Sequence, residues 1–126
     1  MGDRAIIHFT DGATIGPAVY LHLDGHKVGE LLEELTVLMA DRIGDVEYTT
    51  ARFIGIIHTT RPGNLSLGTR NAPAGGLKSV MSSDYSPGDF GVIVVDCLDW
   101  TYYHHGGYGL TLSNPTSRLQ PKDDTI

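Results

Sequence analysis

The 126-residue chain has 40% hydrophobic and 19% charged residues, which is ordinary for one globular domain with its own core. Nine basic and fifteen acidic residues give a net charge of −6, which excludes the basic face that duplex DNA or RNA requires. No apolar run approaches the ~18 residues that a membrane-spanning helix needs. The first residues are charged where a signal peptide would be apolar, so we expect no signal peptide. The lone Cys97 has no internal disulfide partner, as is typical of a reducing compartment. We therefore expect a single domain over residues 1–126 in the cytoplasm, with no membrane or duplex nucleic acid partner.

Two runs of alternating residues open the chain and predict strands at residues 4–10 and 18–24. Asp11-Gly12 between them is a turn signal, so we expect the two strands to pair. One face of this pair is apolar and should lie on the core. The residues expected on that face are Ala5, Ile7, Phe9, Val19, Leu21 and Leu23.

Two consecutive helices are expected next. Apolar residues recur every three or four positions over residues 26–42, and a weaker stripe of the same kind follows over residues 45–59. Gly44 is a natural stop for the first helix, and Asp45 suits the N-cap of the second. Both helices should cover one face of the sheet, namely the face with the apolar residues of the first two strands.

The second half of the chain is rich in strand and turn signals. Five further strands are expected, at residues 65–69, 78–82, 91–96, 100–104 and 108–112. The strand at 91–96 is the most apolar and should be central, and residues 114–126 should form an exposed tail. The predicted fold is α+β, a mainly antiparallel sheet with two consecutive helices packed on one face.

A polar cluster is expected on the opposite face of the first two strands. Its members are His8, Tyr20, His22 and Asp24. Two histidines and an aspartate are able to bind a divalent metal, or to supply a base with its orienting carboxylate. Their spacing matches no metal signature, and the alternative is a polar sheet face that is exposed or buried in an interface. We therefore predict no metal and no cofactor.

An irregular loop follows the strand expected at 65–69. Arg70, Asn71 and Lys78 flank two glycines, and exposed N–H groups beside such cations are suited to a phosphate. The loop is neither a Walker loop nor a dinucleotide fingerprint, so a plain connector is the open alternative.

Aromatic residues gather in the second half of the chain. They are Tyr85, Phe90, Trp100, Tyr102, Tyr103 and Tyr108. Side chains of a strand alternate between its two faces, which puts Trp100 and Tyr102 on one face and Tyr103 on the other. Both faces therefore carry aromatic side chains that should be shielded from water. We therefore predict a homo-oligomer, in which a second copy covers one face.

Two segments near the N-terminus support a resemblance. The opening Gly2-Asp3-Arg4-Ala5 and the later Tyr20-Leu21-His22-Leu23-Asp24-Gly25 resemble small phage and prophage proteins that share a G-[DN]-R-A strand and a "YLH-x-x-G" strand. In size, acidity, two-helix layout and aromatic hairpins, the chain also resembles the Thoeris anti-defence proteins of phages. Those proteins are oligomeric sponges that sequester cyclic ADP-ribose-type signals without cleaving them.

The resemblance implies a small anionic nucleotide ligand at a subunit interface, held by arginines and an aromatic that stacks on adenine. No residue of the family's site aligns with this chain, so the candidates are chosen by their chemistry. They are Arg4, Arg70, Asn71, Phe90 and Arg118. The leading hypothesis is a non-enzymatic phage protein in the host cytoplasm that captures such a signal. Two alternatives stay open: a metal- or His-dependent hydrolase of nucleotides, and a protein-binding accessory module.

Overall fold

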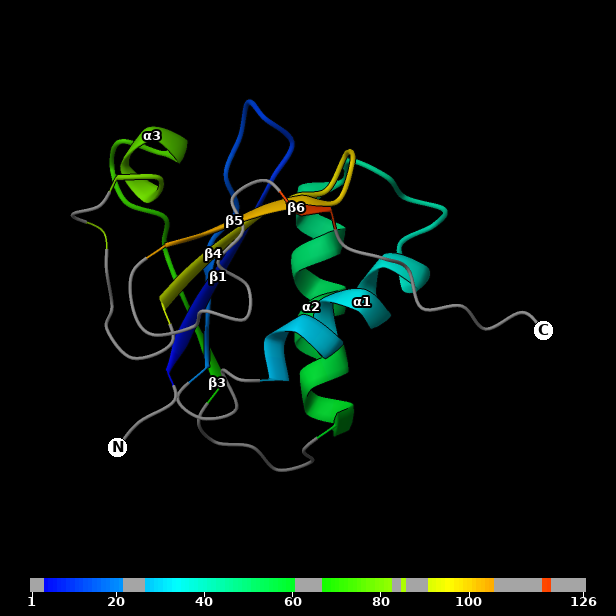
Figure 1. Cartoon of the computed structure of the whole chain (residues 1–126). Helices are drawn as coiled ribbons and strands as arrows, with labels where there is room; N and C mark the ends of the chain where they lie inside the picture. The colour runs from blue at the N-terminus through cyan, green and yellow to red at the C-terminus, as the bar shows by residue number, and fades with distance from the viewer. Residues whose placement is uncertain are drawn as a thin grey trace.

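The computed structural model describes residues 4–21, 27–60, 67–82, 85, 91–105 and 117–118. A six-stranded sheet forms the middle layer, with α1 and α2 on one side and α3 on the other (Figure 1). The elements in chain order are β1 (Ala5–Thr10), β2 (Ala18–Leu21), α1 (Val28–Leu38), α2 (Val46–Thr60), β3 (Leu67–Arg70), α3 (Leu77–Val80), β4 (Gly91–Asp96), β5 (Thr101–His105) and β6 (Ser117–Arg118). The predicted α+β class and the two consecutive helices are confirmed.

The strands lie in the order β3-β2-β1-β4-β5-β6. Four of the five neighbouring pairs are antiparallel, and β1 with β4 is the one parallel pair. A parallel pair needs a long crossover, which here contains β2, both long helices, β3 and α3. The prediction of a mainly antiparallel sheet is confirmed, and so is the central place of β4. Val92 to Val95 are buried because the sheet is covered on both faces at this strand.

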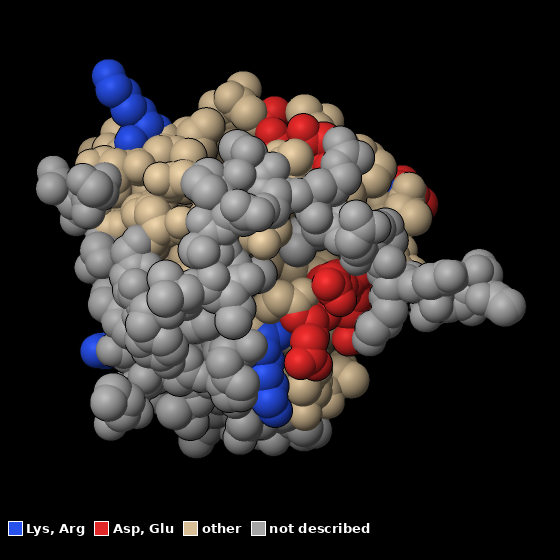
Figure 2. Space-filling view, viewed as in Figure 1, with Lys and Arg blue, Asp and Glu red and all other residues tan. Residues whose placement is uncertain are grey.

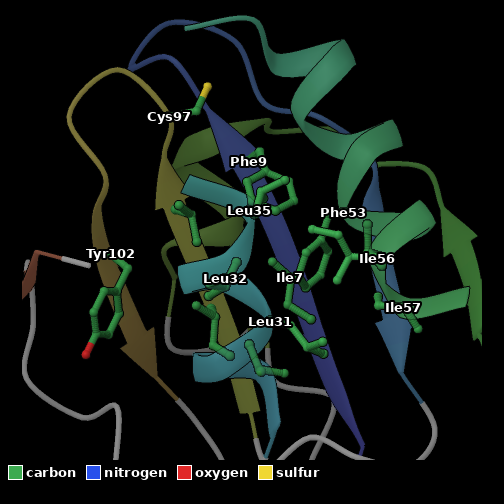
Figure 3. Close-up of a cluster of buried hydrophobic side chains, with 14 of the residues drawn as sticks. Ile7, Phe9, Leu31, Leu32, Leu35, Phe53, Ile56, Ile57, Cys97 and Tyr102 are labelled. Atoms are coloured by element: carbon green, nitrogen blue, oxygen red, sulfur yellow. The ribbon is translucent and has the colours of Figure 1, made fainter. Parts of the chain in front are cut away.

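The main core lies between the sheet and the two long helices (Figure 3). Ala5, Ile7 and Phe9 point from β1 into this core, as their alternation predicted. The Phe9 ring meets the Phe53 ring of α2 edge to face, with 5.3 Å between the ring centroids. Val19 and Leu21 join the same cluster, whereas Leu23 lies outside the described residues. The face of the sheet towards α1 and α2 is called the first face below.

The connection between α1 and α2 is held by side-chain hydrogen bonds. Asp45 caps α2, because its Oδ1 accepts the Tyr48 N–H at 3.0 Å, as the sequence predicted. Arg52 of α2 donates to the Leu38 carbonyl at 2.7 Å and so satisfies one free carbonyl at the end of α1. Gly44 has a φ of 82°, and an added Cβ would lie 2.7 Å from a Leu98 methyl carbon. Only glycine therefore fits where the two helices join.

Two expected strands change in the second half of the chain. The prediction of a strand at residues 78–82 is wrong, because Leu77–Val80 form the short helix α3. Five residues are too few to distinguish a helical repeat of apolar residues from a strand repeat. In the structure, the helix packs its buried Val80 against Val92 and Val94. The strand expected at 100–104 begins one residue later, since Trp100 has a φ of 62° and belongs to the turn.

The predicted hairpin partner at 108–112 lies outside the described residues. Within the predicted tail, Ser117 and Arg118 are described, and they pair with Tyr102 and Thr101 as β6. No helix in the described part of the chain is both long and apolar enough to span a membrane.

Candidate functional site

The opposite side of the sheet, called the second face below, carries the polar residues of the first strands. Side chains of a strand alternate between faces, so Ile6, His8 and Thr10 point away from the main core. The register places Tyr20 opposite Ile6 on one side and opposite Gly68 on the other. Arg70 pairs with Ala18 and thus stands on this same face.

Arg70 and Tyr20 are in direct contact across β2 and β3. The Arg70 guanidinium carbon lies 5.3 Å from the centre of the Tyr20 ring, which is a cation–π distance. Arg70 is exposed, and an added Cβ at the neighbouring Gly68 would meet no atom within 4 Å. The aromatic and the cation therefore stand beside open space at the edge of the sheet.

His8 is fully buried beneath the second face. Its Nδ1 lies 2.9 Å from the Gly16 carbonyl oxygen, and its Nε2 lies 2.8 Å from the Tyr85 hydroxyl. A carbonyl only accepts, so Nδ1 carries the proton and Nε2 accepts the hydrogen bond from Tyr85. Burial lowers the pKa of His8, although the Gly16 carbonyl acts in the opposite direction. His8 is thus a neutral imidazole with both nitrogens bonded.

The expectation that His8 lies on an exposed or interfacial polar face is wrong. Tyr85 covers it, with the two ring centroids 5.6 Å apart. A metal ion at His8 would have to displace Tyr85, because both ring nitrogens are already hydrogen bonded. The other proposed partners, His22 and Asp24, lie outside the described residues. Across the described ranges, no three His, Cys, Asp or Glu side chains are grouped to hold a metal ion.

Tyr85 contacts the buried histidine, and its pKa also responds to the charge of Arg70. Burial raises the pKa of Tyr85, while the positive charge of Arg70 acts to lower it. The charge of Arg70 is therefore close enough to influence the phenol. We name these four residues (His8, Tyr20, Arg70 and Tyr85) the Arg70 cluster. It consists of a cation over the Tyr20 ring, together with the Tyr85 phenol that is hydrogen bonded to the buried His8.

The other predicted ligand residues do not join the Arg70 cluster. Arg4 is half-buried just before β1, and Asn71 is exposed directly after Arg70. Arg118 lies in β6, at the opposite edge of the sheet from Arg70 in β3. Five strand spacings separate these edges, which is about 24 Å. Phe90 lies outside the described residues.

Sequence reasoning placed His8 and Tyr20 in one polar cluster, proposed Arg70 separately, and did not connect Tyr85 with any of them. Tyr85 and His8 are 77 positions apart, and only the fold brings them together. The available signal was chemical: a half-buried tyrosine needs a partner for its hydroxyl. No spacing in the sequence indicates which residue that partner is.

Two other parts of the described surface carry acidic side chains. Figure 2 shows Asp and Glu side chains gathered over α1. A groove of about 620 Å³ lies between the β1–β2 and α1–α2 connections, but Asp11, Asp45 and Glu47 line it. Hydrogen bonds from the Thr14 and Ala13 N–H groups lower the pKa of Asp11, which keeps that carboxylate ionised. Anion binding is therefore expected at Arg70 and not in this larger groove.

No protein-family model, curated protein or solved structure matches the chain. The functional argument accordingly depends on the chemistry of the residues themselves.

Proposed function

We propose that the protein binds a small anionic nucleotide at the Arg70 cluster and sequesters it without cleaving it. The observation that carries this proposal is the exposed guanidinium of Arg70, which lies 5.3 Å from the centre of the Tyr20 ring. A guanidinium forms paired hydrogen bonds with a phosphate, and a neighbouring aromatic ring provides a stacking surface for a base. The open space beside Gly68 leaves room for a planar group next to Tyr20.

The ligand class we favour is a cyclic ADP-ribose-type signal. Such a molecule carries phosphates for Arg70 and an adenine for stacking on Tyr20. The resemblance of the chain to phage anti-defence proteins supports this class and a site of action in the cytoplasm of an infected cell. Capture is favoured over cleavage because the buried His8 has both nitrogens engaged and is not free to activate a water molecule.

The proposal includes a homo-oligomer. Arg70 and Arg118 belong to strands at opposite edges of one sheet, so the proposal does not combine the two arginines of one chain in a single site. A second copy could supply an additional cation at the β3 edge, which is exposed from Gly68 to Arg70. Size-exclusion chromatography with light scattering measures the assembly. A monomer at all concentrations would remove this part of the proposal.

Calorimetry with cyclic ADP-ribose isomers and cyclic oligonucleotides tests the binding. We expect one of them to bind, and Arg70→Ala to weaken it by about 1.5–3 kcal/mol, roughly 10- to 150-fold in Kd. Arg42→Ala is the matched control, because Arg42 also stacks on a tyrosine, 3.6 Å from the Tyr48 ring centre, but lies outside the Arg70 cluster. Absence of binding by every ligand, or equal loss in both variants, would contradict the proposal.

A His-dependent hydrolase is the second candidate. The observation that favours it is the hydrogen bond from Tyr85 to His8, since a hydroxyl bonded to an imidazole is the arrangement of a nucleophile and its base. The two functions can be distinguished by incubating the protein with a nucleotide, denaturing the protein by heat, and identifying the nucleotide that is released. Intact nucleotide supports sequestration, whereas a product that disappears in Tyr85→Phe supports hydrolysis.

A further inference from the structure

A second cavity lies on the second face, between α3 and the strands β4 and β5. Its volume is about 180 Å³. Leu77 and Met81 line it from the α3 side, and Val94 and Tyr103 line it from the sheet. Val94 and Tyr103 are paired across β4 and β5, so the floor is a continuous piece of sheet. The cavity is separate from the Arg70 cluster, with which it shares no residue.

The cavity exists because α3 is too short to cover the sheet. This helix has four residues and packs Val80 against Val92 and Val94. Among the described residues, no helix lies over the sheet surface further along β4 and β5. The Tyr103 ring at the wall also contacts the His105 ring in a tilted arrangement, with 5.5 Å between the centroids. The apolar walls are thus held by the fold itself.

One end of the cavity is polar. Asp96 and Thr101, which are opposite each other in β4 and β5, form its rim. The Asp96 Oδ1 accepts the Leu98 N–H at 2.9 Å, which fixes the direction of the carboxylate. A carboxylate with two oxygens accepts several hydrogen bonds, so Asp96 retains acceptor capacity for a ligand. Its negative charge at the rim disfavours anions.

We infer that this cavity binds a small aromatic ring that carries an N–H donor and no negative charge. An apolar cavity of about 150 Å³ is sufficient for benzene, so the size suits one ring or a compact pair of fused rings. The N–H group would meet Asp96 at the rim while the ring lies between Met81 and Tyr103. Small-molecule sites typically combine apolar walls with a few polar groups in this manner. This ligand differs in charge from the nucleotide proposed for Arg70.

Saturation-transfer NMR and calorimetry with indole test the inference. Indole has the ring and the N–H donor; naphthalene lacks the donor, and indole-3-carboxylate adds a negative charge. We expect indole to bind the full chain at least about tenfold more tightly than either analogue. Binding of all three with equal affinity, or of none, would overturn the assignment.

Met81→Trp is the blocking variant, because Met81 is 39% exposed and a larger side chain there can close the cavity without entering the main core. Leu77→Trp is a second blocking variant from the other end of α3, and thermal unfolding verifies that each folds. Both should abolish indole binding and leave nucleotide binding unchanged. Arg70→Ala should do the reverse. If indole still binds both blocked variants, it binds elsewhere and the inference is wrong.

Discussion

The two faces of the sheet are built differently, although the same strands supply both. On the first face, Phe9, Phe53 and Leu35 belong to one continuous apolar cluster beneath two long helices. On the second face, the apolar cluster of the described residues has three buried members, Val80, Val92 and Val94, and the four-residue helix α3 supplies Val80. The first face therefore supplies most of the buried apolar area. The second face has a buried histidine, an exposed arginine and a cavity, and it is the face to which both binding proposals refer.

The largest difference between the faces should appear on truncation of core side chains. Phe53→Ala removes a fully buried ring that contacts Phe9, and should cost about 3–5 kcal/mol of unfolding free energy. Val94→Ala on the second face removes only two methyl groups and should cost clearly less. Urea denaturation measures both variants. Equal losses would mean that the second face contributes more to stability than its small cluster indicates.

The next effect concerns His8 and pH. Burial lowers the folded-state pKa of His8 below its ordinary value of 6.5, so the unfolded chain binds a proton more readily. His8 therefore contributes stability that is complete above pH 6.5 and is lost as the pH falls through the lowered pKa. His8→Gln should flatten this part of the stability curve. Unfolding free energy measured between pH 7.5 and 4.5 for both proteins checks the sign, and an unchanged slope in the variant would refute it.

A smaller effect is expected at the helix junction of the first face. Asp45→Ala removes the N-cap of α2 together with the ion pair to Arg42, whose Nη1 lies 3.2 Å from the Asp45 Oδ2. The cap should account for about 1 kcal/mol, and the exposed ion pair should add little. Asp45→Asn, which retains a capping side chain but not the charge, separates the two. Thermal unfolding of the two variants should show a larger loss for alanine.

The smallest effect on stability should come from the residue with the largest proposed effect on binding. Arg70 is exposed on an edge strand, so Arg70→Ala should change the unfolding free energy by no more than about 0.5 kcal/mol. Calorimetric unfolding tests this directly. A loss of several kcal/mol would place Arg70 among the structural residues and would weaken its assignment to ligand binding.

Local periodicity was sufficient to predict the first face. Ala5, Ile7 and Phe9 alternate as a strand must, and α1 and α2 carry apolar stripes at helical spacing. Asp45 was recognisable as a cap from its position before the second stripe. In each case the information lies within a few residues, where backbone geometry alone determines which side chains share a face.

The arrangement of residues on the second face became known only from the tertiary structure. Leu77–Val80 are too few for a repeat to be recognised in the sequence, and the structure shows them as a helix that buries Val80 against β4. The parallel pairing of β1 with β4 joins Ala5 to Gly91 across most of the chain, and no local pattern encodes such a partner. The same long-range packing placed Tyr85 over His8 and set Arg118 at the far edge from Arg70. The sequence by itself determined which residues could bind a ligand; contacts between distant segments determined which of them meet.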